Sequence, residues 1–237
     1  MNILAIDTSQ HTLSIALSSP NGVFHTEMHA GQRHSELLMD WIDKLFTSSA
    51  LKPNDLELVA CMKGPGSFTG LRIAYAAAKG LSLSLGIPYA AVPTLDCIAL
   101  PNSIWPGNVL AVLDAKKNCF FASFYNRGQR LTEYMDTDAQ TIIDVFAKSV
   151  SHWTLADQTL KKIPLLVTGS GATLFISKIN DIKFKEKIVI DPFFNKGRSL
   201  EMLQLLNNDD NIKYIEDEVS APLYLRKSDA ELNIKSK

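Results

Sequence analysis

The sequence predicts an α/β fold built in two halves, each with a mixed β-sheet and flanking helices. Two observations lead to this fold class. Up to residue 30 the apolar residues recur with a period of two or in short runs, which is typical of strands. From residue 34 onward, segments with helical periodicity alternate with short apolar runs, the pattern of helices that connect parallel strands.

The first half begins with three strand-like segments. Residues 3–6 form a short apolar run, typical of a strand that is buried on both faces. Residues 11–18 alternate between polar and apolar side chains, and the turn at residues 20–22 leads into a third segment at residues 23–30. We therefore expect an antiparallel meander of three strands.

Two helices and two further strands complete the first half. A helix from His34 is followed by a strand at residues 56–62, and the glycine-rich residues 64–70 lead into a second helix. Gly86 ends this helix, and residues 89–92 form the last strand. This β-β-β-α-β-α-β order is that of one half of an actin-like ATPase fold, also called ribonuclease-H-like.

The second half is more divergent but follows a related order. We expect an N-terminal half over residues 1–104 and a C-terminal half over residues 105–237. The expected strands of the second half are 109–113, 120–125, 165–168 and 188–190, and its expected helices are 139–150, 171–179 and 199–206.

The composition narrows the possible functions. The 237 residues include 24 Lys and Arg against 25 Asp and Glu, a net charge of −1 that argues against autonomous nucleic-acid binding. Cys61, Cys97 and Cys119 are odd in number and widely spaced, so neither a disulfide framework nor a zinc cluster is expected. The first residues lack the basic region of a signal peptide, and no apolar run is long enough to cross a bilayer. We expect a cytoplasmic protein without membrane contact.

A glycine-rich loop and the end of the first strand form the most distinctive local motif. In actin-like ATPases the first strand ends with a carboxylate and a hydroxyl near the phosphate, and glycine-rich loops before helices can bind anions. The loop lacks the Gly-Lys-Ser/Thr ending of a P-loop, and Thr69 stands where a dinucleotide fingerprint has its third glycine. A turn capped by Ser67 or Thr69, with an Asx turn at Asp7, is the structural alternative and the commoner use of such a loop. The candidate residues of this eroded phosphate loop are Asp7, Thr8, Ser9, Gly66, Ser67, Thr69 and Gly70.

The two helices of the first half carry more apolar surface than one contact with a sheet requires. Between Leu71 and Leu85 the only charges are Arg72 and Lys79, and a helix that is apolar almost all round must be covered on more than one face. Either the two helices cover each other and the sheet, or they expose a shared surface to another subunit, and the sequence favours neither. The candidate interface residues are His34, Leu37, Leu38, Trp41, Leu45, Ile73, Ala77, Gly80 and Ser84.

No residue pattern predicts catalysis or a metal site. The sequence contains no Gly-x-Ser-x-Gly nucleophile motif, and residues 169–171 fit a strand-to-helix turn. His25 and His29 lie four residues apart on an expected strand, which separates them by about 13 Å and prevents them from sharing a metal. We expect no catalytic residue and no bound metal in this chain.

Several of these segments, taken in order, resemble the bacterial TsaB family, and the matches span nearly the whole chain. The glycine-rich block is the most specific of them. One departure is Lys116, where the family often has arginine, and a lysine ammonium lacks the bidentate geometry of a guanidinium. The matching stretches are residues 3–9, 34–38, 64–73, 112–116, 168–171 and 222–226.

The resemblance implies a non-catalytic relative of the transferase TsaD. Family members bind and activate TsaD through the two helices described above, and the ATPase TsaE joins the complex. The complex transfers threonylcarbamoyl from its adenylate to the adenosine 3′ of the anticodon in tRNAs that read codons beginning with A. ATP and metal would then be bound by TsaD and TsaE, and tRNA would be bound only through the complex. Without TsaD, the chain would form a homodimer through the same face.

Two alternatives from other classes remain at this point. One is an active ATP-dependent small-molecule kinase with the actin-like fold, which tight ATP binding and turnover by the isolated chain would favour. The other is a metallopeptidase, which stoichiometric zinc or iron in the purified protein would favour.

Overall fold

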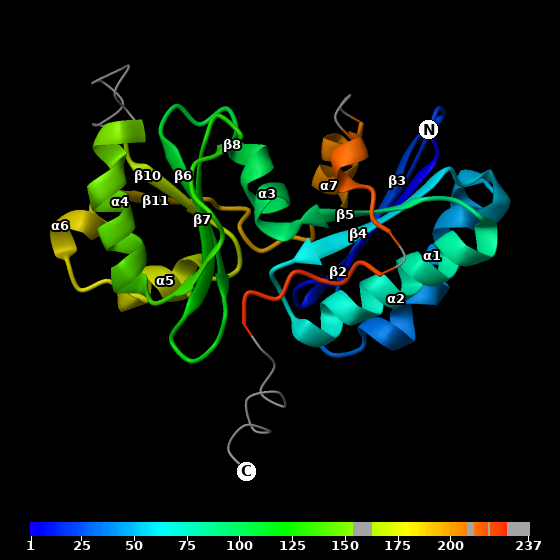
Figure 1. Ribbon diagram of the computed structural model, residues 1–237, viewed down its shortest axis with the longest axis horizontal. Coiled ribbons are helices and arrows are strands. Elements are labelled where there is room, and N and C mark those ends of the chain that lie inside the picture. The colour runs from blue at the N-terminus through cyan, green and yellow to red at the C-terminus, as the bar shows by residue number, and fades with distance from the viewer. Residues whose placement is uncertain (154–162, 208–210, 218, 227–237) are drawn as a thin grey trace, which may run out of the picture. The chain divides into compact units, whose positions relative to one another are not determined.

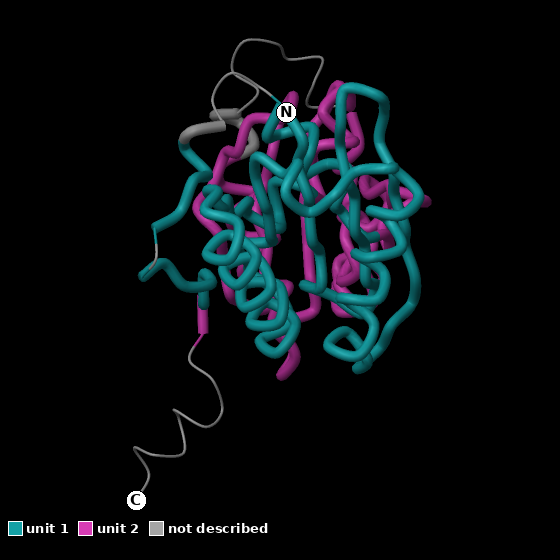
Figure 2. The backbone as a smooth tube through the Cα atoms, turned by 90° about the vertical axis from the view of Figure 1, so that its right-hand side faces the viewer, with its two compact units in different colours: residues 1–97, 197–224 teal, residues 98–196, 225–237 magenta. Residues whose placement is uncertain are grey.

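The computed structural model describes residues 1–153, 163–207, 211–217 and 219–226. The chain divides into two units, shown in different colours in Figure 2. The first unit comprises residues 1–97 and 197–224, and the second unit comprises residues 98–196 and 225–237. The predicted division at residues 104 and 105 is therefore wrong for residues 197–224, which the sequence analysis placed in the second half.

The first unit contains one five-stranded sheet and three longer helices (Figure 1). Its strands are β1 (Ile3–Asp7), β2 (Thr12–Ser19), β3 (Gly22–His29), β4 (Leu58–Gly64) and β5 (Tyr89–Pro93). Its helices are α1 (His34–Ser49), α2 (Phe68–Leu85) and α7 (Ser199–Leu206), with 3-10 turns at Pro53–Asp55 and Asn211–Tyr214. The short helix α3 (Thr94–Ala99) spans the boundary between the units.

The strands of this sheet follow the order β3-β2-β1-β4-β5. β1 pairs antiparallel with β2, and β2 pairs antiparallel with β3, so the predicted meander is confirmed. β1 pairs parallel with β4, and β4 pairs parallel with β5. Helix α1 leads from β3 into β4, and helix α2 forms the crossover between β4 and β5. The sheet is therefore mixed, as the sequence analysis predicted.

Helices cover both faces of the first sheet. α1 and α2 lie on one face, where Leu4, Ile6 and the other inward residues of the strands form an apolar core with them (Figure 1). α7 covers the opposite face, and its Met202, Leu203 and Leu206 pack against strand residues such as Ile3. Every residue of β1 is buried because the strand is covered on both sides.

The helix ends follow the local sequence. The Ser67 hydroxyl accepts a hydrogen bond from the Gly70 N–H at 3.2 Å and so caps the start of α2. Gly86 ends the same helix in the left-handed region at φ 66°. Ala50 ends α1 at φ 56°, a conformation that a residue with a Cβ adopts less readily.

The second unit repeats the topology of the first. Its sheet has the order β11-β10-β6-β7-β8, with β9 paired to β7. β6 and β7 are antiparallel, whereas β6, β10 and β11 are parallel, as β1, β4 and β5 are in the first unit. Two sheets of the same order with flanking helices are the architecture expected of an actin-like fold. The strands are β6 (Asn108–Asp114), β7 (Phe120–Asn126), β8 (Gln129–Arg130), β9 (Met135–Thr137), β10 (Leu165–Thr168) and β11 (Ile188–Ile190).

The helices of the second unit are α4 (Ala139–Trp153), α5 (Ala172–Lys178) and α6 (Ile182–Lys185), with a 3-10 turn at Leu100–Asn102. The sequence analysis missed β8, β9 and α6, because two to four residues do not establish a periodicity. Phe120 and Phe175 pack edge to face at 5.5 Å in the core of this unit. None of the helices in the described ranges is long and apolar enough to cross a membrane.

Candidate functional site

The Asp7 carboxylate at the end of β1 is enclosed by the chain itself. Its Oδ1 accepts hydrogen bonds from the Ser9 N–H at 2.9 Å and the Ser9 hydroxyl at 2.7 Å. Its Oδ2 accepts a hydrogen bond from the Arg198 N–H at 2.8 Å, at the start of α7. Asp7 is fully buried. The Asx turn that the sequence analysis offered as the structural alternative is therefore present, and Arg198 adds a long-range contact to it.

The glycine-rich loop packs directly on the end of β1. The Ser67 N–H donates to the Ser9 carbonyl oxygen at 2.8 Å, and the Thr8 hydroxyl donates to the Gly70 carbonyl oxygen at 2.7 Å. A Cβ at Gly66 would lie 2.7 Å from the Ser9 carbonyl oxygen, and one at Gly70 would overlap the Thr8 carbonyl oxygen. Both glycines therefore allow backbone to approach backbone, which any larger residue would prevent.

The structure thus brings all residues of the eroded phosphate loop together except Thr69, which is exposed on the first turn of α2. Ser67 caps α2, as the structural alternative requires. Hydrogen bonds between the loop and the end of β1 stabilise the conformation of both.

Residues Gly169 and Gly171 of the second unit have a similar packing role. A Cβ at Gly171 would lie 2.7 Å from the Leu113 carbonyl carbon. The turn therefore fits the strand-to-helix role that the sequence analysis preferred. At the neighbouring hairpin tip, the Lys116 ammonium lies 2.7 Å from the Asp114 carboxylate, and both Lys116 and Lys117 are exposed. Across the described ranges, no three His, Cys, Asp or Glu side chains are placed to hold a metal ion.

Three of the predicted interface residues belong to the core of the first unit. His34, Leu38 and Leu45 are 5%, 2% and 6% exposed, so their assignment to a partner surface is wrong. They point toward the sheet because α1 packs on β2 and β3 with this face. Leu37 and Trp41 are half-buried at the margin of the same core, and the Lys44 ammonium lies 4.1 Å from the Trp41 ring.

His34 has a structural role at the start of α1. Its Nε2 donates a hydrogen bond to the Gln10 carbonyl oxygen at 2.8 Å, which ties the helix to the connection between β1 and β2. Burial lowers the pKa of His34 below its usual value, because the charged imidazolium loses hydration.

Helix α2 has an outward face made of small and apolar residues. Of the predicted interface residues on this face, Gly80 and Ser84 are exposed, whereas Ile73 and Ala77 are half-buried against the core. A Cβ added at Gly80 would meet no atom within 4 Å. The sequence analysis missed two exposed residues of this face, Ala76 and Leu83, although positions 76, 80 and 83 share one side of a helix. Leu83 is 81% exposed. We call Ile73, Ala76, Ala77, Gly80, Leu83 and Ser84 the α2 surface.

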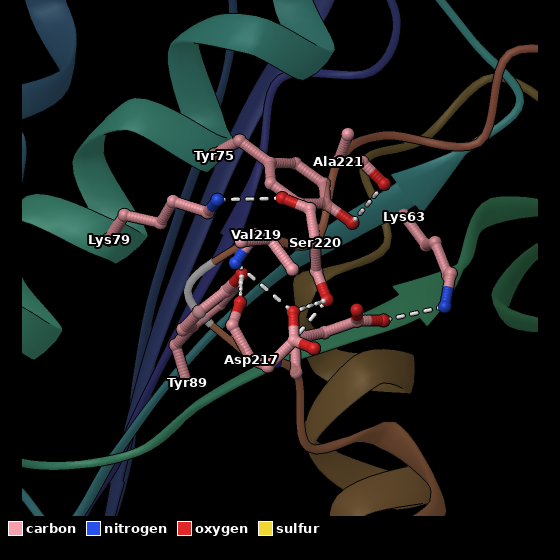
Figure 3. A network of polar contacts seen from close by, with 9 residues as sticks. Lys63, Tyr75, Lys79, Tyr89, Asp217, Val219, Ser220 and Ala221 are labelled. Carbon is pink, nitrogen blue, oxygen red and sulfur yellow. Dashed lines mark hydrogen bonds and ion pairs between the residues drawn. The ribbon is translucent and has the colours of Figure 1, made fainter.

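A later segment, residues 214–217 and 219–224, lies along the other side of α2 and is called the strap (Figure 3). The Lys79 ammonium donates to the Ser220 carbonyl oxygen at 2.6 Å, and the Tyr75 hydroxyl donates to the Ala221 carbonyl oxygen at 3.3 Å. Arg72, the other charged residue of α2, donates to the Tyr224 hydroxyl at 3.2 Å. Both charges of α2 are therefore directed toward the strap, and the α2 surface carries none.

The strap also contacts the sheet of the first unit (Figure 3). The Lys63 ammonium lies 2.5 Å from the Glu216 carboxylate, and the Tyr89 hydroxyl donates to the Asp217 carbonyl oxygen at 2.7 Å. Burial raises the pKa of Tyr89 to about 12 and also raises the pKa of Tyr75. No local pattern in the sequence predicts these contacts, because the residues that the strap contacts are distant from it in sequence.

Comparisons with known proteins identify relatives over most of the chain. A family model described as TsaD, tRNA N6-adenosine threonylcarbamoyltransferase, matches residues 10–233. The tRNA threonylcarbamoyladenosine biosynthesis protein TsaB of Bacillus subtilis is 30% identical over 183 residues, which cover 77% of this chain and 76% of that protein. TsaB of Escherichia coli is 34% identical over 134 residues, which cover 54% of this chain and 57% of that protein.

Two solved structures from Pseudomonas aeruginosa have the same fold. One, described as an uncharacterized protein with similarity to peptidase YEAZ, superposes with a TM-score of 0.76 at 20% identity, over 95% of this chain and 99% of that chain. The other, described as YeaZ, has a TM-score of 0.74 at 18% identity, over 94% of this chain and 99% of that chain. On the family model and the Bacillus subtilis relative, this chain belongs to the TsaB family.

Proposed function

We propose that this chain is the non-catalytic subunit of a complex that adds threonylcarbamoyl to tRNA adenosine, and that it binds and activates the transferase TsaD. The names of the family model and of the TsaB relatives support the reaction. In this proposal TsaD and TsaE bind the metal and ATP, and tRNA is bound only through the complex. The complex works in the cytoplasm, and without TsaD the same surface pairs two copies of this chain.

The observation that carries the proposal is Gly80 in the middle of the exposed face of α2. A glycine at this position costs the helix about 0.5–1 kcal/mol relative to alanine. Nothing in the described part of the chain requires it, since a Cβ there would meet no described atom within 4 Å. A second helix that approaches α2 closely would require it. The neighbouring Ala76, Ala77 and Ser84 are small as well, so the α2 surface fits the backbone of a partner helix.

The charge distribution on α2 supports the same interpretation. The strap binds the side chains of Arg72 and Lys79, so a partner can cover the α2 surface without burying an unpaired charge. Leu83 adds a large exposed apolar side chain to this surface. Binding of a partner that excludes water from this apolar surface lowers the free energy of the complex.

The enclosure of Asp7 supports the non-catalytic part of the proposal. In an active ATPase of this fold, the carboxylate at this position faces phosphate and metal. In this chain its two oxygens accept three hydrogen bonds from Ser9 and Arg198, and the glycine-rich loop packs against the same strand end. The carboxylate thus stabilises the fold instead of binding a ligand.

A pair of identical substitutions tests the proposal. Ala76→Glu places a charge on the α2 surface, and Ala147→Glu places the same charge on the exposed side of α4. When each variant is co-expressed with TsaD, we expect Ala147→Glu to co-purify with the transferase and Ala76→Glu to lose it. Circular dichroism and thermal melting establish that both variants are folded. Co-purification of the folded Ala76→Glu variant at the wild-type level would disprove docking through α2.

A further inference from the structure

The charges of the chain are divided unequally between its two units. The first unit has 8 Lys and Arg against 14 Asp and Glu, whereas the second unit has 16 Lys and Arg against 11 Asp and Glu. The net charge of −1 is therefore the sum of −6 in the first unit and +5 in the second. Such an asymmetry is typical of a protein in which one part contacts nucleic acid or another polyanion.

Several basic side chains of the second unit already have partners within it. Two of them form ion pairs with carboxylates, and two lie over aromatic rings. These four are Lys116, Arg226, Arg130 and Lys196. Their positive charge is partly compensated inside the unit, so they are less available to an external anion.

The segment 178–187 holds four lysines, which we call the lysine surface. Among the residues that the structure describes, no carboxylate or aromatic ring pairs with any of their ammonium groups. The four are Lys178, Lys183, Lys185 and Lys187. Uncompensated positive charge of the second unit is therefore concentrated within ten consecutive residues.

The apolar residues between these lysines fix the backbone that carries them. Phe175 and Ile179 of the α5 region are buried in the core of the second unit. In α6, the ring of Phe184 packs edge to face on Phe146 of α4 with centroids 5.8 Å apart (Figure 1). Three of the lysines are consequently exposed, and Lys185 is half-buried. A ligand that binds them has to order side chains but no backbone, which lowers the entropic cost of binding.

The acidic residues of the segment do not neutralise it. The Asp181 carboxylate accepts a hydrogen bond from the Phe184 N–H at 3.2 Å and caps the start of α6. Glu186 is the other acidic residue, so the segment has a net charge of +2. A lysine in the last turn of a helix interacts favourably with the helix dipole, but Lys187 lies beyond the end of α6.

We propose that the lysine surface contacts the phosphate backbone of tRNA in the assembled complex. Lysine ammonium groups bind phosphates as point charges, and each neutralised phosphate releases counterions from the nucleic acid. Contacts with the backbone carry no sequence information, so they suit a subunit that serves several tRNAs. The inference rests on the proposed function, which supplies the tRNA, and it adds a contact made by this chain.

An anionic membrane is a less suitable partner for this surface. A helix that binds at a membrane surface turns its apolar face toward the lipid. In α5 and α6 the rings of Phe175 and Phe184 pack on the core instead. Ile182 is exposed, but one side chain gives little apolar area for insertion into lipid. The phosphates of a nucleic acid require positive charge without an apolar face, as this segment provides.

Two double variants with the same loss of charge test the inference. Lys183→Gln/Lys187→Gln changes the lysine surface, and Lys52→Gln/Arg127→Gln changes exposed positions elsewhere. Each variant is assembled with TsaD and TsaE, and the binding of a fluorescently labelled tRNA is titrated at several salt concentrations. For the first variant we expect the dissociation constant to rise at least about tenfold at about 0.1 M salt. The slope of log K against log salt should become less steep by about 1.5–2, whereas the control should match the wild type.

Lysine acetylation provides a second measurement on the unchanged complex. The wild-type assembly is treated with acetic anhydride with and without saturating tRNA, and mass spectrometry quantifies the product at each lysine. Lys178, Lys183 and Lys187 should react several-fold more slowly when tRNA is bound, because phosphate contacts cover their ammonium groups. The reactivity of Lys52 should not change.

The inference would be overturned by an unchanged dissociation constant and slope, by equal changes in both double variants, or by lysines that tRNA does not protect. Stronger binding to vesicles of phosphatidylcholine and phosphatidylserine than to tRNA would also overturn it. Failure of the chain to bind TsaD would instead refute the proposed function. The titration of the isolated chain at low salt, where phosphate contacts are strongest, would then decide the inference, because the two double variants should still differ.

Discussion

Replacing Gly80 by alanine should have opposite effects on the stability of the fold and on the binding of TsaD. Gly80 lies in the interior of α2, where alanine is favoured over glycine by about 0.5–1 kcal/mol, and the added methyl group meets no atom within 4 Å. We therefore expect the Gly80→Ala variant to be more stable than the wild type, with Tm higher by about 1–4 °C. The same methyl group should weaken TsaD binding, because it holds the partner helix away.

The control uses the same substitution six residues later. Gly86 ends α2 at φ 66°, so alanine there is strained although it also meets no atom within 4 Å. Gly86→Ala should therefore lower the free energy of unfolding by about 1 kcal/mol and leave TsaD binding unchanged. Urea denaturation and isothermal titration calorimetry measure the two quantities. A Gly80→Ala variant that is less stable than the wild type, or that binds TsaD equally well, would refute the reasoning.

Three further predictions concern the core and the strap. Asp7→Ala should lower the free energy of unfolding by about 2–5 kcal/mol, because it leaves buried donors unpaired, while tRNA modification by the folded reconstituted complex stays at the wild-type rate. A large loss of modification in the folded complex would show that the carboxylate still binds a ligand. Gly70→Ala should prevent folding because its Cβ overlaps the Thr8 carbonyl oxygen, so soluble, native-like protein would contradict the packing described here.

Burial raises the pKa of Tyr89 from 10.0 to about 12, so the unfolded chain loses this proton first as the pH rises. The free energy of unfolding should fall between pH 10 and pH 12, and the fall should be smaller in Tyr89→Phe, as urea denaturation across this range can test.

Local patterns predicted most elements of the first unit correctly. The alternation around β2 and the turn at Pro20 and Asn21 are short-range signals, and the structure contains the hairpin that they predict. The helix between the fourth and fifth strands predicted that these two strands run parallel, as they do in the structure. The capped turn at Ser67 was also foreseen as an alternative, since its hydroxyl and the Gly70 N–H are only three residues apart.

Contacts between distant residues could not be predicted in this way. Arg198 donates to Asp7 across 191 positions, and Lys63 pairs with Glu216 across 153 positions, so no local pattern reports either contact. The error at Leu38 and Leu45 has a related cause. Helical periodicity shows that these residues share an apolar face, but the width of that face alone does not show which part of it the sheet covers.

The candidate site was only partly predictable. Gly80 and Ser84 were identified because small residues recur at helical spacing along α2. Leu83 was missed because it stands between two serines, and its exposure depends on where the sheet lies. The uncharged character of the α2 surface depends on the strap, whose contacts with Arg72 and Lys79 no local pattern predicts.

The division of the first unit between residues 1–97 and 197–224 has a consequence during synthesis on the ribosome. Helix α7 covers one face of its sheet, and the strap covers the β5 edge. This face and this edge therefore remain exposed to solvent while the intervening residues, about a hundred, are translated. The native arrangement of the first unit is completed only after residue 224 has emerged. A nascent chain arrested near residue 190 would therefore expose the apolar side chains of Ile3 and Leu58, which makes it a natural substrate for chaperones.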